Sequence, residues 1–274
     1  MRKVALVTGS SRGIGEKIIH NFAKNGYNVI IAAKSRENIN NSGSIYSVQK
    51  SIEKYNVESL ALHLDLRSID SIENCVEQID KKFSRLDILI NNASALWWNN
   101  MLRTQEKRYN LINDINAKGS FYMSKYCLPL MKRNNFGHII NHSPPLINMR
   151  DMNIYKNKTA YLMSKFSMTM VAMGIAAENK DYNIAANTIW PKTAIDTDAV
   201  RKNKLGDKKN WRKPDIIADA IEKIALKEPH TFTGNQLIDE DFLRSEGVVN
   251  FQKYQSVSGF EPLPLDELFN LSYK

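Results

Sequence analysis

Tyr161 and Lys165 are four residues apart in the sequence, and this spacing suggests that the two side chains act together in acid/base chemistry. On a helix this spacing places both side chains on one face. A tyrosine with a pKa of about 10 is a poor proton donor or acceptor at neutral pH. An ammonium group one turn away stabilises the tyrosinate and moves that pKa toward the working range. The pair predicts acid/base chemistry, although the spacing alone is a frequent accident on amphipathic helices.

A glycine-rich turn near the N-terminus predicts a phosphate site. It follows the apolar run Val4–Val7 and reads Thr8-Gly9-Ser10-Ser11-Arg12-Gly13-Ile14-Gly15. Three glycines let the backbone turn tightly and approach a pyrophosphate, which lies at the N-terminus of the following helix. A plain strand-to-helix turn, the alternative, does not need three glycines. The residues expected to bind a dinucleotide here are Gly9, Ser11, Arg12, Gly13, Ile14 and Gly15.

Short apolar runs alternate with amphipathic stretches along the chain, and these elements must position both motifs. The runs that predict buried parallel strands are Val4–Val7, Val29–Ala33, Leu60–Leu64, Ile88–Ile90, Ile139–Ile140, Ile184–Ile189 and Phe232–Ile238. The periodic stretches that predict helices are Ile14–Asn25, Ile45–Tyr55, Ile69–Phe83, Leu102–Lys132, Ala160–Asn179 and Asp215–Leu226. Such alternation implies right-handed βαβ units. We therefore expect an α/β fold, a doubly wound, mostly parallel, Rossmann-like sheet with helices on both faces.

The domain organisation follows from the same pattern. A chain of 274 residues is within the range of one α/β domain. We expect a single dinucleotide-binding domain at 1–240 and a C-terminal extension at 241–274 packed on it. Two stretches that break the alternation, 144–158 and 191–214, are long enough to be functional loops or lids.

Composition excludes several classes of protein. With 43% hydrophobic and 24% charged residues, wholesale disorder is excluded. No apolar run reaches the roughly 18–20 residues that span a bilayer, so no membrane span is expected. Cys75 and Cys127 lie in helical patterns and indicate a reduced, cytoplasmic protein. No His, Cys or Asp cluster has metal-ligand spacing, so no metal is expected.

The net charge of +9 raises the question of a nucleic-acid partner. The lysines are scattered, and their densest cluster, within 201–213, falls in an expected loop. Neither zinc-finger spacing nor an aromatic-rich RNA-binding motif is present. The pattern favours a solvated surface over nucleic-acid binding. A third interpretation is that basic side chains surround the entrance of a binding site and attract an anionic cofactor or substrate.

The glycine turn and Tyr161-Leu162-Met163-Ser164-Lys165 together resemble the short-chain dehydrogenase/reductase family, and the resemblance covers nearly the whole chain. It implies hydride transfer between a nicotinamide dinucleotide and a carbonyl or alcohol carbon. In this resemblance Tyr161 is the acid/base, and Lys165 activates it and holds the nicotinamide ribose. The long helices of the family pair across a two-fold axis, which implies a homo-oligomer. Met168, Val171 and Ile175 recur at helical spacing, which fits either core burial or such an interface.

Further segments match the family in order. Asn92 and Ala93, in Leu89-Ile90-Asn91-Asn92-Ala93, are expected to line the cofactor site. Asp65-Leu66 resembles the pair that packs against and hydrogen-bonds the adenine. Asn116 matches a helix asparagine that fixes a water linked to the catalytic lysine. The resemblance also assigns Pro191 and Ile195 to the cofactor site.

Two departures from the family pattern affect the chemistry. Lys192 stands where most members have glycine, so its cation is expected either near the cofactor or in solvent. The segment His142-Ser143-Pro144 has proline where the family has the serine that polarises the carbonyl, and proline has no donor. Ser143 is offset by one residue toward the other face of the strand. We expect it to bond a neighbouring backbone group and to contribute little. Because adjacent strand residues face opposite sides, a His142–Ser143 nucleophile pair is not expected.

The end of the second strand indicates which dinucleotide is bound. It reads Ala33-Lys34 and lacks the acidic residue that would bind a ribose 2′-hydroxyl. Lys34 and Arg12 are placed to pair with a 2′-phosphate instead, unless both face solvent. The prediction is therefore NADP, with NAD the less favoured cofactor.

Two functions of different classes remain open on the sequence. The favoured one is an oxidoreductase acting on a small-molecule carbonyl or alcohol, lipid-like or otherwise apolar. The alternative is a dinucleotide-responsive binding protein with little or no turnover, which Pro144 favours. Trp97 and Trp98 follow Asn91-Asn92-Ala93. They could form the base of an apolar substrate site, or they could simply pack in the core or on the surface.

Overall fold

The computed structural model describes residues 2–37, 43–146, 152–265 and 267, and its centre is a seven-stranded sheet. The strands follow the order β3-β2-β1-β4-β5-β6-β9, and every neighbouring pair is parallel. Their bounds are β1 Val4–Thr8, β2 Asn28–Ala33, β3 Ser59–His63, β4 Ile88–Asn91, β5 Gly137–His142, β6 Ile184–Trp190 and β9 Gln236–Ile238. The order reverses between β1 and β4, which makes the sheet doubly wound.

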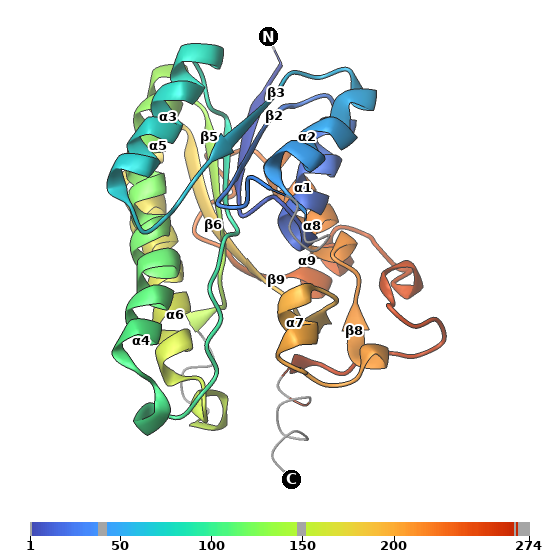
Figure 1. Ribbon diagram of the computed structural model, residues 1–274. Coiled ribbons are helices and arrows are strands. Elements are labelled where there is room, and N and C mark those ends of the chain that lie inside the picture. The colour runs from blue at the N-terminus through green and yellow to red at the C-terminus, as the bar shows by residue number, and fades with distance from the viewer. Residues whose placement is uncertain (1, 38–42, 147–151, 266, 268–274) are drawn as a thin grey trace.

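Helices cover both faces of this sheet (Figure 1). On one face lie α1 Gly13–Lys24, α2 Ile45–Ile52 and α8 Asp215–Ala225. On the other lie α3 Ile69–Phe83, α4 Glu106–Ile112, α5 Gly119–Asn134 and α6 Thr159–Glu178. The expected fold, a doubly wound parallel sheet with helices on both faces, is confirmed.

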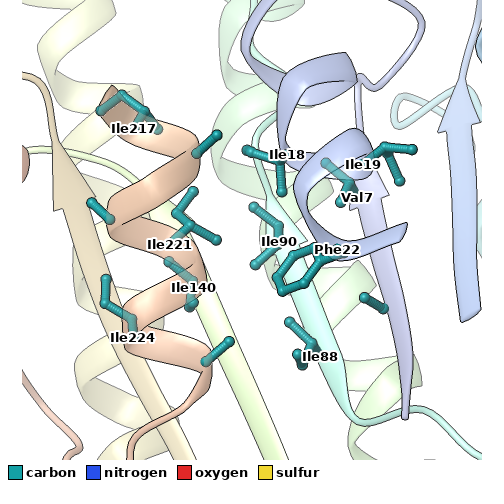
Figure 2. Packing of buried hydrophobic residues seen from close by; sticks show 14 of the residues in the cluster. Val7, Ile18, Ile19, Phe22, Ile88, Ile90, Ile140, Ile217, Ile221 and Ile224 are labelled. Atoms are coloured by element: carbon teal, nitrogen blue, oxygen red, sulfur yellow. The ribbon is translucent and has the colours of Figure 1, made fainter. Parts of the chain in front are cut away.

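The apolar core lies in two layers, one on each face of the sheet. In one layer α1 and α8 pack side by side, and Ile18, Phe22 and Ile221 meet above the sheet residues Ile90 and Ile140 (Figure 2). Because both faces are covered, the central strands are buried along their whole length, as β1 and β2 are. This burial is the physical reason why the strands appear in the sequence as continuous apolar runs.

Several elements differ from the expected bounds, and two of them differ because the backbone changes conformation inside the predicted element. The predicted helix Leu102–Lys132 is divided by a π-helical turn at Asn113–Lys118, which separates α4 from α5. There the chain passes close to Leu66, since a Cβ added to Gly119 would lie 2.9 Å from the Leu66 Cβ. The predicted strand Phe232–Ile238 is also too long, because β9 begins only at Gln236.

The shortened strand has a local cause. Gly234 adopts φ +75, a left-handed conformation that interrupts a strand. Its N–H donates to the Ala186 carbonyl oxygen at 2.8 Å, and Asn187 Nδ2 donates to the Phe232 carbonyl oxygen at 2.9 Å. These residues therefore form a turn that leads the chain into β9.

Both expected loops contain short elements. Within 144–158 the structure has a 3-10 turn at Met152–Tyr155, and residues 147–151 lie outside the described part of the chain. Within 191–214 lie β7 Ala194–Ile195, α7 Asp198–Lys202 and β8 Trp211–Arg212. Strands β7 and β8 pair as a separate two-stranded sheet.

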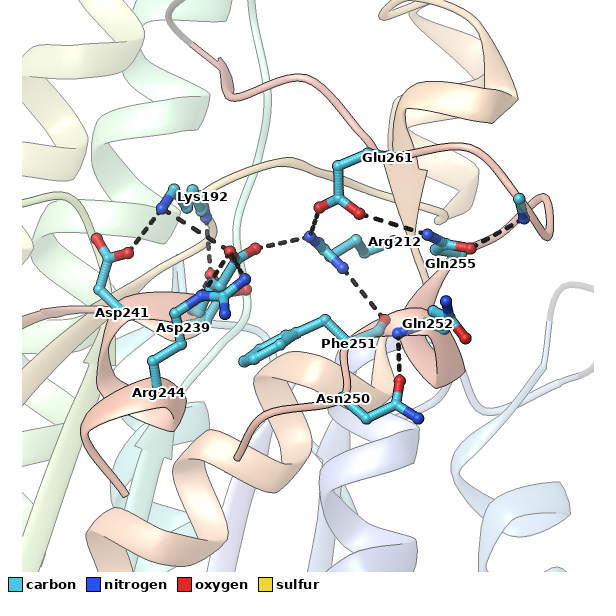
Figure 3. A network of polar contacts seen from close by, with 12 residues as sticks. Lys192, Arg212, Asp239, Asp241, Arg244, Asn250, Phe251, Gln252, Gln255 and Glu261 are labelled. Atoms are coloured by element: carbon cyan, nitrogen blue, oxygen red, sulfur yellow. Dashed lines mark hydrogen bonds and ion pairs between the residues drawn. The ribbon is translucent and has the colours of Figure 1, made fainter. Parts of the chain in front are cut away.

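A buried arginine links this loop to the C-terminal residues (Figure 3). Arg212 pairs with Glu240 and Glu261 at 2.7 Å each and donates to the Phe251 carbonyl oxygen at 3.3 Å. Removing one member of a buried ionic network leaves an uncompensated charge and is strongly destabilising. Nearby, burial raises the pKa of Asp239, the first residue of α9 (Asp239–Ser245), to about 7.

The chain then returns toward the loop that follows β6. Thr193 forms an antiparallel bridge with Pro264, and the Leu265 N–H donates to the Lys192 carbonyl oxygen at 2.8 Å. Helix α9 crosses the expected boundary at residue 240. The division into a domain at 1–240 and an extension at 241–274 stays a prediction.

Helix α6 is long and apolar enough to cross a membrane by length and composition, with a mean hydropathy of 1.2. More than half of that segment, 56%, is buried inside the protein. It packs against β5, β6 and α5. The helix is therefore a core helix of the α/β fold.

Candidate active site

A cavity of about 1540 Å³ lies at the carboxyl ends of the parallel strands, where ligands bind in open α/β sheets. It brings together almost all residues that the sequence indicated. Those that line it are Gly9, Ser11, Arg12, Gly13, Ile14, Gly15, Lys34, Asp65, Leu66, Asn92, Ala93, Tyr161, Lys165, Pro191 and Ile195. Asn116 is the predicted site residue that does not line it.

The glycine turn approaches the neighbouring strand so closely that no side chain fits. Gly9 has φ +68, and a Cβ there would lie 2.8 Å from the Ala93 Cα. At Gly15, inside α1, a Cβ would lie 2.6 Å from the Gly9 carbonyl oxygen and 2.7 Å from Asn92 Nδ2. Such a bare backbone at the start of a helix fits a dinucleotide pyrophosphate.

Hydrogen bonds hold the end of β4 against this turn. Thr8 Oγ1 accepts from the N–H groups of Asn92 and Ala93 at 3.1 and 3.0 Å. Asn92 Nδ2 donates to the Thr8 carbonyl oxygen at 2.9 Å. On the other side, the Ala32 N–H of β2 donates to Ser10 Oγ at 3.0 Å. The turn is therefore fixed from both neighbouring strands.

Basic side chains gather at the far end of the cavity, beyond β2 and β3. Lys34, Arg36 and Arg67 all line it. Arg67 hydrogen-bonds the Asp65 carboxylate and holds the pKa of that carboxyl well below its usual range. Lys34 Nζ lies 3.5 Å from the same carboxylate and is largely exposed. Arg36 and Arg67 were missed from the sequence, although both follow predicted strands.

Tyr161 and Lys165 share the buried face of α6, as their spacing predicted. Lys165 Nζ donates to the His142 carbonyl oxygen at 2.7 Å and lies 5.6 Å from the Trp190 ring centroid. Burial lowers the pKa of Lys165 to about 7. Burial raises the pKa of Tyr161 above its ordinary value, and hydrogen bonding from Ser94 partly opposes this rise. The expected lowering of the tyrosine pKa is therefore wrong for the protein alone, because burial disfavours the charged tyrosinate.

Asn116 acts on the loop after β4 rather than on the cavity. Its amide Nδ2 donates to the Ala95 carbonyl oxygen at 3.0 Å and to Ser164 Oγ at 2.9 Å. Its Oδ1 accepts from the Ala95 N–H at 2.8 Å. The fully buried side chain thus fastens this loop to α6, next to Lys165. Its expected role in holding a water stays a prediction.

Ser143 is turned away from the cavity. It is fully buried, and Thr169 Oγ1 donates to its hydroxyl oxygen at 2.8 Å. Thr169 Oγ1 also lies 2.7 Å from the Pro144 carbonyl oxygen. The expected backbone partner of Ser143 is wrong, since its partner is the Thr169 side chain. Pro144 itself lines the cavity.

Two other residues of interest have defined partners. Burial lowers the pKa of His142 to about 3, so its ring, packed edge-on to Trp190, is neutral. Lys192 lines the cavity, but its Nζ pairs with Asp241 at 2.7 Å. Its cation is therefore neutralised by the start of α9 rather than left to solvent.

An apolar side completes the cavity beside Tyr161. Trp98 packs edge-on to Tyr161 with ring centroids 6.4 Å apart. Other apolar lining residues here are Leu96, Ile154, Leu162, Phe166 and Trp190. Trp97 instead donates to Thr104 Oγ1 at 3.3 Å and does not line the cavity. Of the two tryptophans, only Trp98 belongs to this apolar side.

Within the described part of the chain, no group of three His, Cys, Asp or Glu side chains could hold a metal ion.

Comparison with known proteins places this site in a family. A family model described as short chain dehydrogenase matches residues 3–208. Hydroxysteroid dehydrogenase-like protein 2 of Mus musculus is 41% identical over 95% of this chain and 54% of its own length. The Homo sapiens protein of that name is 41% identical over 95% of this chain and 62% of its own length. The chain therefore spans somewhat more than half of these relatives.

A solved structure shows the same architecture. A short chain dehydrogenase from Mycobacterium thermoresistibile has a TM-score of 0.87 at 37% sequence identity, over 96% of this chain and 93% of that chain. The resemblance inferred from the glycine turn and the Tyr161–Lys165 pair is confirmed. This chain belongs to the short-chain dehydrogenase family and is an oxidoreductase of that family.

Proposed function

We propose that this enzyme transfers a hydride between NADP(H) and the carbonyl or hydroxyl carbon of an apolar, lipid-like small molecule. One observation carries the proposal: a single cavity joins the glycine turn to Tyr161, Lys165 and a set of apolar side chains. The glycine turn fits a dinucleotide, and the apolar side fits a hydrophobic substrate.

The residues support a simple division of labour. A bound nicotinamide supplies the hydride on reduction and accepts it on oxidation. Tyr161 donates a proton to the carbonyl oxygen on reduction and takes it from the hydroxyl on oxidation. Lys165 holds the nicotinamide ribose, and its ammonium stabilises the tyrosinate. Asn116 keeps the loop at Ala95 and helix α6 in register around this pair.

A turnover screen tests the proposal. Aliphatic and aromatic ketones, aldehydes and alcohols are incubated with both dinucleotides, and the nicotinamide absorbance is followed. Turnover of an apolar carbonyl or alcohol supports the oxidoreductase. Tight dinucleotide binding without turnover on any of them would favour the binding protein with little activity, for which Pro144 in the cavity is the supporting observation.

NADP is expected to bind more tightly than NAD. Lys34 and Arg36 follow β2 and line the end of the cavity, and Lys34 directly follows the strand, where an acidic residue would bind a ribose 2′-hydroxyl. Charge-assisted bonds to a 2′-phosphate are among the stronger hydrogen bonds. Arg36→Ala should weaken NADP binding about tenfold, or 1.4 kcal/mol, and leave NAD binding unchanged. Fluorescence titration with both cofactors measures this, and tighter binding of NAD to the unaltered protein would refute it.

We also propose a homo-oligomer. Met168 and Ile175 are buried in the core, so they do not supply an interface. Met163 and Met170 instead expose half or more of their surface on the outer side of α6. Apolar side chains exposed along a core helix fit a second copy of the chain. Met170→Glu should then lower the mass measured by light scattering at micromolar concentration, whereas the exposed control Val249→Glu should not. A monomeric unaltered protein would end this proposal.

Localisation and other partners stay predictions. The cytoplasmic location rests on Cys75 and Cys127, which are free and buried. The expectation of no nucleic-acid partner rests on the scattered lysines.

A further inference from the structure

Hydride transfer to a carbonyl needs a hydrogen-bond donor to the carbonyl oxygen, and Pro144 occupies the position where the family has a serine for this purpose. Hydride addition to a carbonyl builds negative charge on the oxygen, and each donor aimed at that charge is worth about 10²–10³ in rate. Pro144 lines the cavity but has neither a hydroxyl nor an N–H group. Ser143 is fully buried and engaged with Thr169, so its hydroxyl is not available to a substrate. The second donor must therefore come from another element.

Ser94, in the loop after β4, presents a hydroxyl at the right place. Its side chain is exposed and lines the same cavity as Tyr161 and Pro144. The loop that carries Ser94 packs against Tyr161 through Trp98, whose ring centroid lies 6.4 Å from that of the phenol, and Ser94 lowers the pKa of Tyr161. The contact of Ser94 Oγ with the Ala95 carbonyl oxygen is 3.4 Å long, which is weak for an O–H donor. Because a hydroxyl proton rotates freely, it can turn toward a ligand oxygen beside Tyr161.

The backbone on both sides of Ser94 is held in place. The Ala93 N–H donates to Thr8 Oγ1 at 3.0 Å, which ties it to β1. On the other side, the Asn116 side chain bonds both the N–H and the carbonyl oxygen of Ala95. A donor that is fixed before the reaction stabilises developing charge without reorganisation. The burial of Asn116 thus serves the position of Ser94 as well as that of α6.

We propose that the Ser94 hydroxyl donates the second hydrogen bond to the substrate oxygen and replaces the missing serine at position 144. The proposal rests on the proposed hydride transfer. On reduction the hydride, released as a C–H bond of a reduced nicotinamide breaks, would form the new C–H bond at the carbonyl carbon, and the C=O π pair would move to the oxygen. The Tyr161 O–H bond breaks and its proton passes to that oxygen. Ser94 keeps its proton throughout, because it only donates a hydrogen bond.

Three variants test this assignment: Ser94→Ala removes the hydroxyl, Ser94→Thr keeps one, and Ser143→Ala is the matched control. On a carbonyl substrate from the screen, Ser94→Ala should lower kcat about 10²–10³-fold. Ser94→Thr and Ser143→Ala should each stay within about tenfold of the unaltered enzyme. Since Ser94 lowers the pKa of Tyr161, Ser94→Ala should also move the limb of the pH–rate profile that reports Tyr161 to higher pH. A Ser94→Ala enzyme with nearly normal kcat, or a Ser143→Ala enzyme with the large loss, overturns the assignment.

A measurement without turnover separates this inference from the proposed function. Carbonyl-labelled acetophenone is bound to the enzyme with oxidised NADP, which has no hydride to give, and its C=O stretch is recorded by difference infrared spectroscopy. A polarised carbonyl absorbs at lower frequency, so we expect a downshift that is lost in Ser94→Ala and kept in Ser94→Thr and Ser143→Ala. A downshift that survives in Ser94→Ala, or no downshift in the unaltered enzyme, counts against Ser94. Failure to reduce any carbonyl counts instead against the proposed function.

Discussion

Tyr161→Phe is expected to abolish turnover, with a loss of about 10³-fold or more, while the dinucleotide binds nearly as tightly as before. The change removes one hydroxyl, the group assigned to move the substrate proton, and leaves the aromatic ring packed against Trp98. The glycine turn and the basic end of the cavity are untouched. Steady-state kinetics on a substrate from the screen, together with cofactor titration, measure the two effects separately.

Lys165→Ala is the variant to compare with Tyr161→Phe, because it tests the roles assigned to the lysine. Lys165 is nearly fully buried beside the cavity and bonds the His142 carbonyl oxygen, so its loss removes both the stabilising cation and the expected ribose contact. It should lower turnover and weaken dinucleotide binding together. If Tyr161→Phe retained most of its activity on a genuine substrate, the acid/base would have to be another group.

Gly15→Ala is expected to lower the free energy of unfolding by about 3 kcal/mol, near the upper end of the cost of overpacking. It should also weaken dinucleotide binding at least tenfold, because the glycine turn must shift. The new Cβ would lie 2.6 Å from the Gly9 carbonyl oxygen and 2.9 Å from the Ser10 Cα, both of which are backbone atoms. Denaturant unfolding and fluorescence titration measure the two effects.

Gly174→Ala is the matched control. Gly174 also lies inside a helix, α6, but a Cβ there would meet no atom of the chain within 4 Å. Alanine is a better helix former than glycine, so this variant should be as stable as the unaltered protein or up to about 1 kcal/mol more stable. Equal behaviour of the two variants would mean that the close approach at Gly15 does not constrain the turn.

The architecture was predictable from the sequence because buried segments have a recognisable apolar composition. Strands covered on both faces, such as β1 and β2, are buried at every position, so their central residues, Val4–Val7 and Val29–Ala33, appear as uninterrupted apolar runs. The glycine turn was predictable for a related reason, since only glycine allows the approach seen at Gly9 and Gly15. Helical spacing likewise placed Tyr161 and Lys165 on one face, because that spacing is a local property of the helix.

The ends of elements and the partners of polar side chains depended on the tertiary structure. The helical periodicity of the sequence continues through Leu102–Lys132 without a break. Only the structure shows the π-helical turn between α4 and α5, next to the close approach of Gly119 to Leu66. Ser143 was expected to bond backbone, and its bond to Thr169 depends on how α6 packs on β5. Arg67 was not expected in the cavity, because its pairing with Asp65 depends on the geometry of the loop that follows β3.

The chemistry of the site divides in the same way. The sequence by itself determined the family, the parallel sheet, the glycine turn and the shared helical face of Tyr161 and Lys165, because each depends on local spacing or on the identity of a residue. Only the tertiary structure decided the direction of the Tyr161 pKa shift, because desolvation depends on everything that surrounds a group. It alone placed Ser94 in the cavity that Tyr161 lines and turned Ser143 away, because the end of a strand and a helix distant in the sequence meet only when the sheet is covered.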